Sequence, residues 1–159
     1  MSSSMPFDVT PVIEQLAAQV QALQQVRGAA DYAAITALRD FRVPEGFVLI
    51  TNERSASQDS ARISTGASAV AGHARQAAVV EIGVVLAVRN YRYQHGAPAV
   101  NDALPIIGAV RDALIGWLPP GVRGARPLRW LRGYVLDYDA GTLLWADTFT
   151  TQHFIGKTP

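Results

Sequence analysis

The residues with reactive side chains lie far apart in this sequence and form no familiar catalytic pattern. The chain has three histidines, His73, His95 and His153, but no cysteine, and no two histidines lie at helical spacing. Ser64 stands in "RISTG" without a recognisable base. The phosphate-binding and nucleophile motifs GxxxxGK[ST], GxGxxG and GxSxG do not occur. We therefore expect no enzyme activity, no bound metal and no cofactor.

Arginines provide the most informative charges. Arg123, Arg126, Arg129 and Arg132 lie close together in "GVRGARPLRWLRG". The first two belong to a Gly- and Pro-rich loop, and strand alternation predicts that Arg129 and Arg132 lie on opposite faces of the following strand. Such a cluster could protect a sheet edge, form salt bridges with a neighbouring subunit or contact nucleic-acid phosphates.

Composition indicates one soluble, globular domain that spans residues 1–159, because 49% of the residues are hydrophobic and 17% are charged. No apolar run is long enough to cross a bilayer, and residues 1–9 are expected to form a flexible tail without a secretion signal. The formal net charge of +1 gives no global indication of nucleic-acid binding. The lack of cysteine fits a reducing cytoplasm, or a particle built there.

Apolar residues at three- and four-residue steps predict three helices. The first is expected to be capped by Thr10 and to end at Gly28. A shorter helix is expected to begin near Asp31 and to carry Ile35 and Leu38 on its apolar side. The third helix is expected to have Asn101 or Asp102 as its cap and to include Trp117 in its buried stripe.

Three further segments predict the sheet. "FVLI", residues 47–50, is a short buried strand, and residues 77–88 form a longer strand that is apolar on both faces and therefore central. The last third predicts a β-hairpin around "YDAGT", with Gly141 in the left-handed conformation. The register expected from this turn pairs Tyr138 with Thr142, Leu136 with Leu144, and Tyr134 with Ala146.

These elements predict an α/β chain of the α+β type, with a small mixed or antiparallel sheet of about four strands, a long β-hairpin and two or three helices. Both faces of the hairpin are apolar, so helices on both sides of the sheet or a fellow subunit must cover them. Residues 51–77 contain few large aliphatic side chains, and Ala, Ser and Gly occupy 14 of the 27 positions. We expect this segment to be a long loop or hairpin arm inserted between strands.

The order of the elements resembles the tail terminator (tail completion) proteins of long-tailed bacteriophages. The resemblance covers about residues 12–155 and rests on the succession of the following segments: "VIEQLAAQVQAL", "FVLI", the soft insertion, "AAVVEIGVVLAVRN", "DALPIIGAVRDALIGWLPP" and "PLRWLRGYVLDYDAGTLLWADTFTTQHFI". Its most specific part is the end, where a helix closing in "GWLPP" precedes "GYVLDYDAG" and "LLWADTFTTQHFI".

This resemblance implies a structural virion protein without cofactor or catalysis. It implies a hexameric ring on the head-proximal end of the tail tube, which stops tube polymerisation and offers a docking surface to the head connector. The implied partners are the major tail tube protein, connector or neck proteins and the tape measure protein, while DNA only passes through the lumen. The implied location is the virion tail, after assembly in the host cytoplasm and without a membrane.

Seven arginines are the predicted subunit, tube or lumen contacts of such a ring. They are three arginines of the 51–77 segment and the four of the later cluster: Arg54, Arg62, Arg75, Arg123, Arg126, Arg129 and Arg132. Two alternatives stay open at this point. The chain could be another head–tail adaptor or neck ring protein, or it could be a nucleic-acid-binding module that uses the arginines of residues 123–132.

Overall fold

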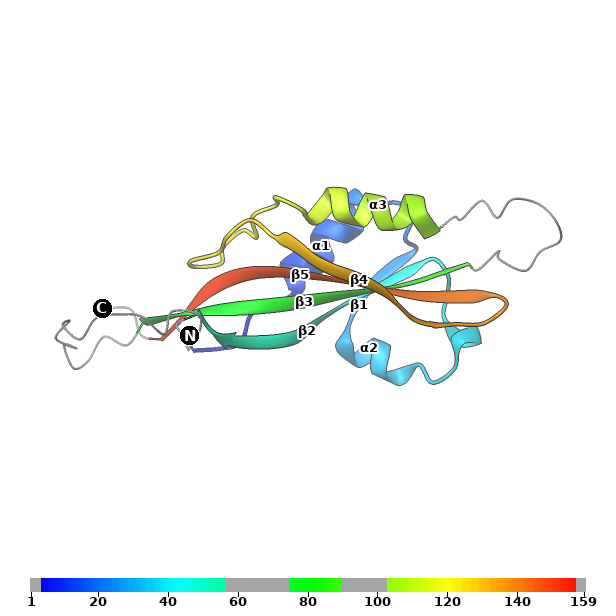
Figure 1. Cartoon of the computed structure of the whole chain (residues 1–159), viewed down its shortest axis with the longest axis horizontal. Helices are drawn as coiled ribbons and strands as arrows, with labels where there is room; N and C mark the ends of the chain where they lie inside the picture. The colour runs from blue at the N-terminus through cyan, green and yellow to red at the C-terminus, as the bar shows by residue number, and fades with distance from the viewer. Residues whose placement is uncertain (1–3, 57–74, 90–102, 157–159) are drawn as a thin grey trace.

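The computed structural model describes residues 4–56, 75–89 and 103–156, which form a five-stranded mixed sheet with helices on both faces (Figure 1). The strands lie in the order β1-β2-β3-β5-β4. Only β1 and β2 pair in parallel. The elements are α1 Thr10–Gln19, β1 Gln25–Gly28, α2 Ala29–Ala34, the short 3-10 helix η1 Leu38–Asp40, β2 Glu45–Ser55, β3 Arg75–Arg89, α3 Ala103–Leu114, β4 Arg129–Tyr138 and β5 Thr142–Gly156.

The predicted α+β class with a mixed sheet is confirmed, and so is the central place of the doubly apolar strand. β3 lies in the middle of the sheet, and every residue from Ile82 to Val88 is buried. Its partner β5 is equally long, and the two strands pair along their whole length, from Arg75 with Gly156 to Arg89 with Thr142.

Two cores of unequal size lie on the two faces of the sheet. Helices α1 and α3 pack on one face and enclose the larger core, which includes Leu16, Ile82, Leu114 and Phe149. Helix α2 and η1 lie against the other face, where a smaller core forms around Phe47. Of the two coverings considered for the sheet, the structure therefore shows helices on both sides.

The prediction that the first helix continues to Gly28 is wrong. Helix α1 ends at Gln19, and the last four residues up to Gly28 form β1, which pairs with β2. Thr10 is the first helical residue rather than the cap. Its hydroxyl and backbone N–H both donate to Asp8 Oδ1, at 2.7 and 2.9 Å, and these bonds hold the pKa of Asp8 below its ordinary value.

The two later helices are also shorter than expected. Helix α2 stops at Ala34, Ile35 is extended, and Leu38 begins the separate η1, so the predicted single helix is divided. Helix α3 ends at Leu114, and Trp117 lies in the following turn, where its N–H donates to the Leu114 carbonyl. The proposed caps Asn101 and Asp102 lie outside the described residues.

The hairpin register is correct at Tyr134, which pairs with Ala146, but wrong nearer the turn. Tyr138 pairs with Leu143 because an irregularity between Val135 and Asp137 shifts the register by one residue. Gly141 is also not left-handed. The Asp139 carboxylate closes the turn instead, since its Oδ1 accepts the N–H groups of Gly141 and Thr142, at 2.8 and 2.7 Å.

The segment predicted as a loop or arm, 51–77, overlaps two strands. Residues up to Ser55 belong to β2, and those from Arg75 belong to β3. Residues 57–74 lie outside the described part of the chain. In the N-terminal segment, Phe7 is buried against the larger core, and its N–H donates to Glu53 Oε2 at 3.1 Å.

Candidate functional site

Four of the seven predicted contact arginines share one face of the sheet. Residues directly opposite each other on paired strands present their side chains on the same face. Arg54 lies opposite Val79, Arg75 opposite Gly156, Arg129 opposite Thr150 and Arg132 opposite Thr148, all on the α2 side of the sheet. We call these four residues the arginine face. They lie on three different strands, so only the folded sheet brings them together.

The expectation that Arg129 and Arg132 lie on opposite faces of their strand is wrong. Trp130 pairs with Phe149, but the next pair joins Arg132 to Thr148. Leu131 is therefore an extra, unpaired residue. Because of it, each later residue of β4 points to the face opposite to the one that regular alternation predicts. The bulge brings Arg132 to the side that Arg129 already occupies.

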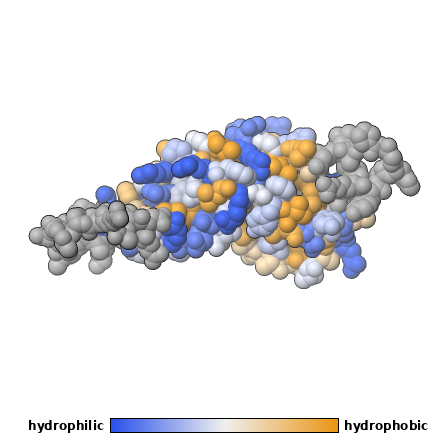
Figure 2. Space-filling model, in the orientation of Figure 1, coloured by the Kyte–Doolittle hydropathy of each residue, from blue (hydrophilic) through white to orange (hydrophobic). Residues whose placement is uncertain are grey.

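The arginine face lies on the half of the sheet that α2 and η1 leave uncovered. The smaller core beneath these helices uses Val85, Ala87 and Leu144, which lie toward the other end of the strands. In Figure 2, hydrophobic residues are more frequent in the right half of the view, near α2 and the hairpin, and hydrophilic residues form bands across the middle and left.

The contacts of Arg132 and Arg75 are weak ones. Glu81 is the acidic residue that the described strands place among them, and its Oε2 lies 3.4 Å from Arg132 Nη2. The side chain of Arg132 remains 55% exposed, so this ion pair is a weak surface contact. The Arg75 guanidinium lies 4.4 Å from the centre of the Phe154 ring. On this part of the described sheet, four arginines thus surround one carboxylate, that of Glu81.

The remaining predicted contact arginines lie elsewhere. Arg123 and Arg126 belong to the loop before β4. This loop lies beside the C-terminal part of β5, past the point where β4 begins to pair with it. The Arg123 carbonyl accepts the N–H of Phe154 at 2.8 Å, and the Arg126 carbonyl accepts the Thr151 hydroxyl at 2.6 Å. These positions therefore fasten the loop to the sheet edge. Arg62 lies outside the described residues.

Strand β4 is an exposed sheet edge with an unusual amount of apolar surface. Every residue of this strand except Gly133 is exposed. Its large apolar side chains, each between 40% and 58% exposed, are Trp130, Leu131, Tyr134, Val135, Leu136 and Tyr138. Edge strands of soluble proteins usually carry charges or are covered, so this edge has the character of a protein-binding surface.

A partly buried polar cluster links α3, β5 and β4. Arg111 of α3 donates two hydrogen bonds to Asp147 of β5, each 2.9 Å long, and these bonds raise the pKa of Arg111 above its ordinary value. Asp147 is fully buried, and its Oδ1 also accepts the indole N–H groups of Trp130 and Trp145, at 3.1 and 3.0 Å. Gly133 leaves space for this cluster, because a Cβ there would lie 2.4 Å from Asp147 Oδ1.

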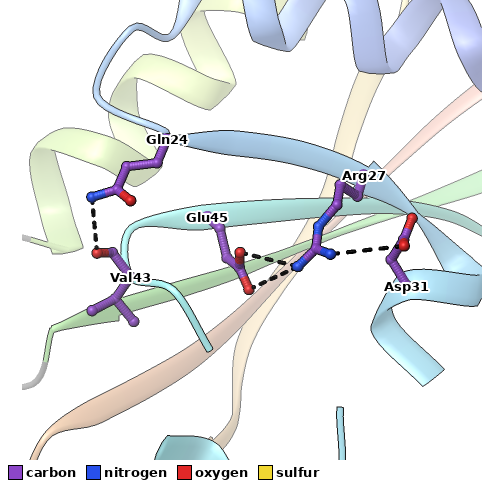
Figure 3. Close-up of polar contacts among 5 residues, drawn as sticks. All are labelled: Gln24, Arg27, Asp31, Val43 and Glu45. Carbon is purple, nitrogen blue, oxygen red and sulfur yellow. Dashed lines mark hydrogen bonds and ion pairs between the residues drawn. The ribbon is translucent and has the colours of Figure 1, made fainter. Parts of the chain in front are cut away.

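The opposite edge of the sheet, β1, borders an open groove of about 610 Å³. Arg27 of β1 lies between two acids beside it (Figure 3): its Nη2 is 3.2 Å from Glu45 Oε2, and its Nη1 is 3.7 Å from Asp31 Oδ1. Arg42 also lines the groove, is exposed and forms no ion pair with the residues that the structure describes. Little in the sequence predicts this site, because "QVRG" lies in the segment expected to end the first helix.

Within residues 4–56, 75–89 and 103–156, no group of three or more His, Cys, Asp or Glu side chains could hold a metal ion. None of the helices in this part of the chain is long and apolar enough to cross a membrane.

Comparison with protein families identifies the chain. The family model described as "Phage tail terminator protein" matches residues 2–159. The chain belongs to the phage tail terminator family. This family is a structural rather than an enzymatic one. The resemblance seen in the sequence is thus confirmed.

A solved structure is similar in fold to this chain. It is the cryo-EM structure of the sheath/tube terminator of an extracellular contractile injection system, PVC, in the extended state. The TM-score is 0.50 at 12% identity, and the match covers 98% of the present chain. The present chain spans only 58% of the length of that chain, and the likeness shows the fold alone. No curated protein sequence matches.

Proposed function

We propose that this protein caps the head-proximal end of the phage tail tube as a hexameric ring, and that the arginine face is one of its contact surfaces. The observation that carries the proposal is the gathering of Arg54, Arg75, Arg129 and Arg132 on the half of the sheet that α2 and η1 leave uncovered, in a chain of the terminator family. A structural role requires no cleft or catalyst. It requires contact surfaces for partner proteins, held in place by a rigid fold.

The mechanism is capping by binding. A ring seated on the last layer of the tube occupies the surface to which the next tube subunits would add, so polymerisation stops. The outer side of the same ring then presents the docking surface for the head connector. Length itself would be measured by the tape measure protein, with which the ring shares the end of the tube. Assembly takes place in the host cytoplasm, and the finished ring stays in the virion.

The arginine face suits an acidic surface on the tube or on a neighbouring subunit. Guanidinium groups form paired hydrogen bonds with carboxylates and stay charged at any physiological pH. Arg132 is held loosely by Glu81 at 3.4 Å, so a better-placed carboxylate on a partner could compete for it. A contact of this kind would make capping sensitive to ionic strength.

The double variant Arg129→Glu/Arg132→Glu tests this surface. Both side chains are exposed on an edge strand, so we expect the folded protein to lose less than about 1 kcal/mol of stability. Capping should fall at least tenfold, because both charges become repulsive toward an acidic partner. The measurement is the length distribution of purified tail tubes polymerised with increasing amounts of each variant, observed by negative-stain electron microscopy.

The matched control is Arg39→Glu. The Arg39 side chain is 87% exposed and lies in η1, away from the arginine face, so reversing its single charge should leave capping unchanged, whereas Arg129→Glu alone should already weaken it. Full capping by the double variant would remove the arginine face from the proposal. An equal loss with the Arg39 control would mean that net charge, rather than this surface, controls capping.

A second candidate function is favoured by the same four arginines, because guanidinium groups on one face could contact phosphates of DNA. Four such contacts predict an affinity that falls about 100-fold between about 50 and 200 mM salt. Binding of a fluorescent DNA duplex, measured at several salt concentrations, gives this slope. Arg129→Glu/Arg132→Glu should flatten it by about half if DNA is the partner. A protein that fails to bind DNA at 50 mM salt excludes this function.

A further inference from the structure

We propose that neighbouring subunits of the ring join sheet edge to sheet edge, with β4 of one copy lying antiparallel to β1 of the next copy, in the groove beside it. This inference rests on the proposed ring and names the surface that closes it. The partner is a second copy of this chain.

Symmetry requires two different surfaces for such a ring. A closed ring of more than two subunits forms through head-to-tail contacts, so each subunit uses one surface toward each neighbour. The sheet has two ends in its strand order, β4 and β1. Each therefore presents backbone groups that no strand of the described chain pairs with along its outer side. The two edges differ in sequence and length, as a head-to-tail contact demands.

The strand directions favour this combination. β1 runs parallel to β2, and each following step across the sheet is antiparallel, so β1 and β4 run in opposite directions. When two copies stand side by side in the same orientation, β4 of one and β1 of the next are antiparallel. Antiparallel edges form the more stable kind of ladder. A contact between two β4 edges would instead be two-fold and would close at a dimer.

The strand registers place β1 and β4 at the same level along the strand direction. Val26 of β1 lies opposite Gly46, Gly46 opposite Leu86, Leu86 opposite Trp145, and Trp145 opposite Val135 of β4. One row of the sheet thus runs from Val26 to Val135. A rotation about an axis along the strands brings Val135 of one copy beside Val26 of the next. This level of β4 carries the exposed Tyr134, Val135 and Leu136, whose apolar surface the contact would cover.

One pair of opposite charges fits this docking. The row next to Val26 ends in Asp137 on β4 and begins with Gln25 on β1. Asp137 is exposed, and the groove at Gln25 is lined by the exposed Arg42, by Asp40 and by Arg27, which is already paired with Glu45 and Asp31. The same docking would therefore set the Asp137 carboxylate of one copy near the Arg42 guanidinium of the next.

Cysteine cross-linking tests this contact directly, because the chain contains no cysteine of its own. Val26→Cys and Val135→Cys replace side chains by others of similar size and leave all charges in place. Facing residues of antiparallel strands have Cα atoms about 4.5–5.5 Å apart, within the range of a disulfide. The double variant Val26→Cys/Val135→Cys should form a ladder of covalent oligomers up to six copies under mild oxidation, seen on a non-reducing gel. Mixed single variants should form only dimers.

Two controls limit the interpretation. Each single variant alone should form no cross-links. The double variant Val26→Cys/Arg39→Cys should form none either, because Arg39 is 87% exposed but lies in η1 and not on β4. Efficient dimers from Val135→Cys alone would overturn the proposal in favour of a two-fold β4 contact. A hexamer by native mass without cross-links would overturn this contact but leave the ring. A chain that is monomeric both free and on tail tubes would overturn ring and contact together.

Discussion

Replacing Arg111 by methionine should lower the free energy of unfolding by about 3 kcal/mol, or about 6–12 °C in melting temperature for a chain of this size. The reason is the neighbouring carboxylate. Asp147 is fully buried, and Arg111 is the cation beside it, through two bonds of 2.9 Å. Without Arg111, the side-chain donors that the described residues still offer this buried negative charge are the two indole N–H groups. Arg111 is itself 32% exposed, so water replaces part of the lost interaction.

Chemical denaturation monitored by tryptophan fluorescence measures this effect. The control is Arg39→Met, which removes the same side chain from an 87% exposed position and should change stability by less than about 0.5 kcal/mol. Adding Asp147→Asn to Arg111→Met should recover part of the loss, because no buried charge then remains. If this second change brings no recovery, the loss comes from packing and the account in terms of charge fails.

Gly133→Ala should destabilise the protein by a similar amount, about 2–3 kcal/mol, although it adds only one methyl group. The new Cβ would lie 2.4 Å from Asp147 Oδ1, 2.7 Å from a ring atom of Trp145 and 2.8 Å from Arg111 Nη2. The carboxylate would have to move, and its bonds to Arg111 and both indoles would be strained together. Thermal unfolding by circular dichroism gives the comparison with the parent protein.

A matched control exists for this change as well. Gly108 lies in α3, and a Cβ there would have no heavy atom within 4 Å. Gly108→Ala should therefore stabilise the protein by about 0.5–1 kcal/mol, since alanine favours a helix. Gly133→Ala and Arg111→Met act on one cluster, so their effects should overlap. Strictly additive losses would show that they disturb separate parts of the structure.

The large features of the fold were predictable because they depend on hydrophobic pattern. A run that is apolar on both faces, residues 77–88, had to lie inside the sheet, and β3 does. β1 was not predictable from its four residues. Its strand conformation depends on pairing with β2. In the sequence before it, Val20 and Leu23 continue the helical spacing of α1. Tertiary pairing therefore decides where α1 ends.

The arginine face was only partly predictable, for a specific reason. Arg129 and Arg132 are three residues apart, so regular alternation separates them. One extra residue, Leu131, reverses this outcome. Arg54 and Arg75 were predicted as contacts, but their place beside the other two depends on how β2, β3 and β5 pair. Bulges and strand order are set by the whole sheet, and local sequence carries little trace of them.

The order of the strands also has a consequence for synthesis of the protein on the ribosome. β5 is the last strand made, yet it lies between β3 and β4. Until it emerges, β3 has only β2 as a neighbour, and one side of a strongly apolar strand stays without its pairing partner. Such strand edges favour aggregation during folding. Yield of soluble protein should therefore depend on growth temperature and chaperone supply more than the stability of the finished chain would indicate.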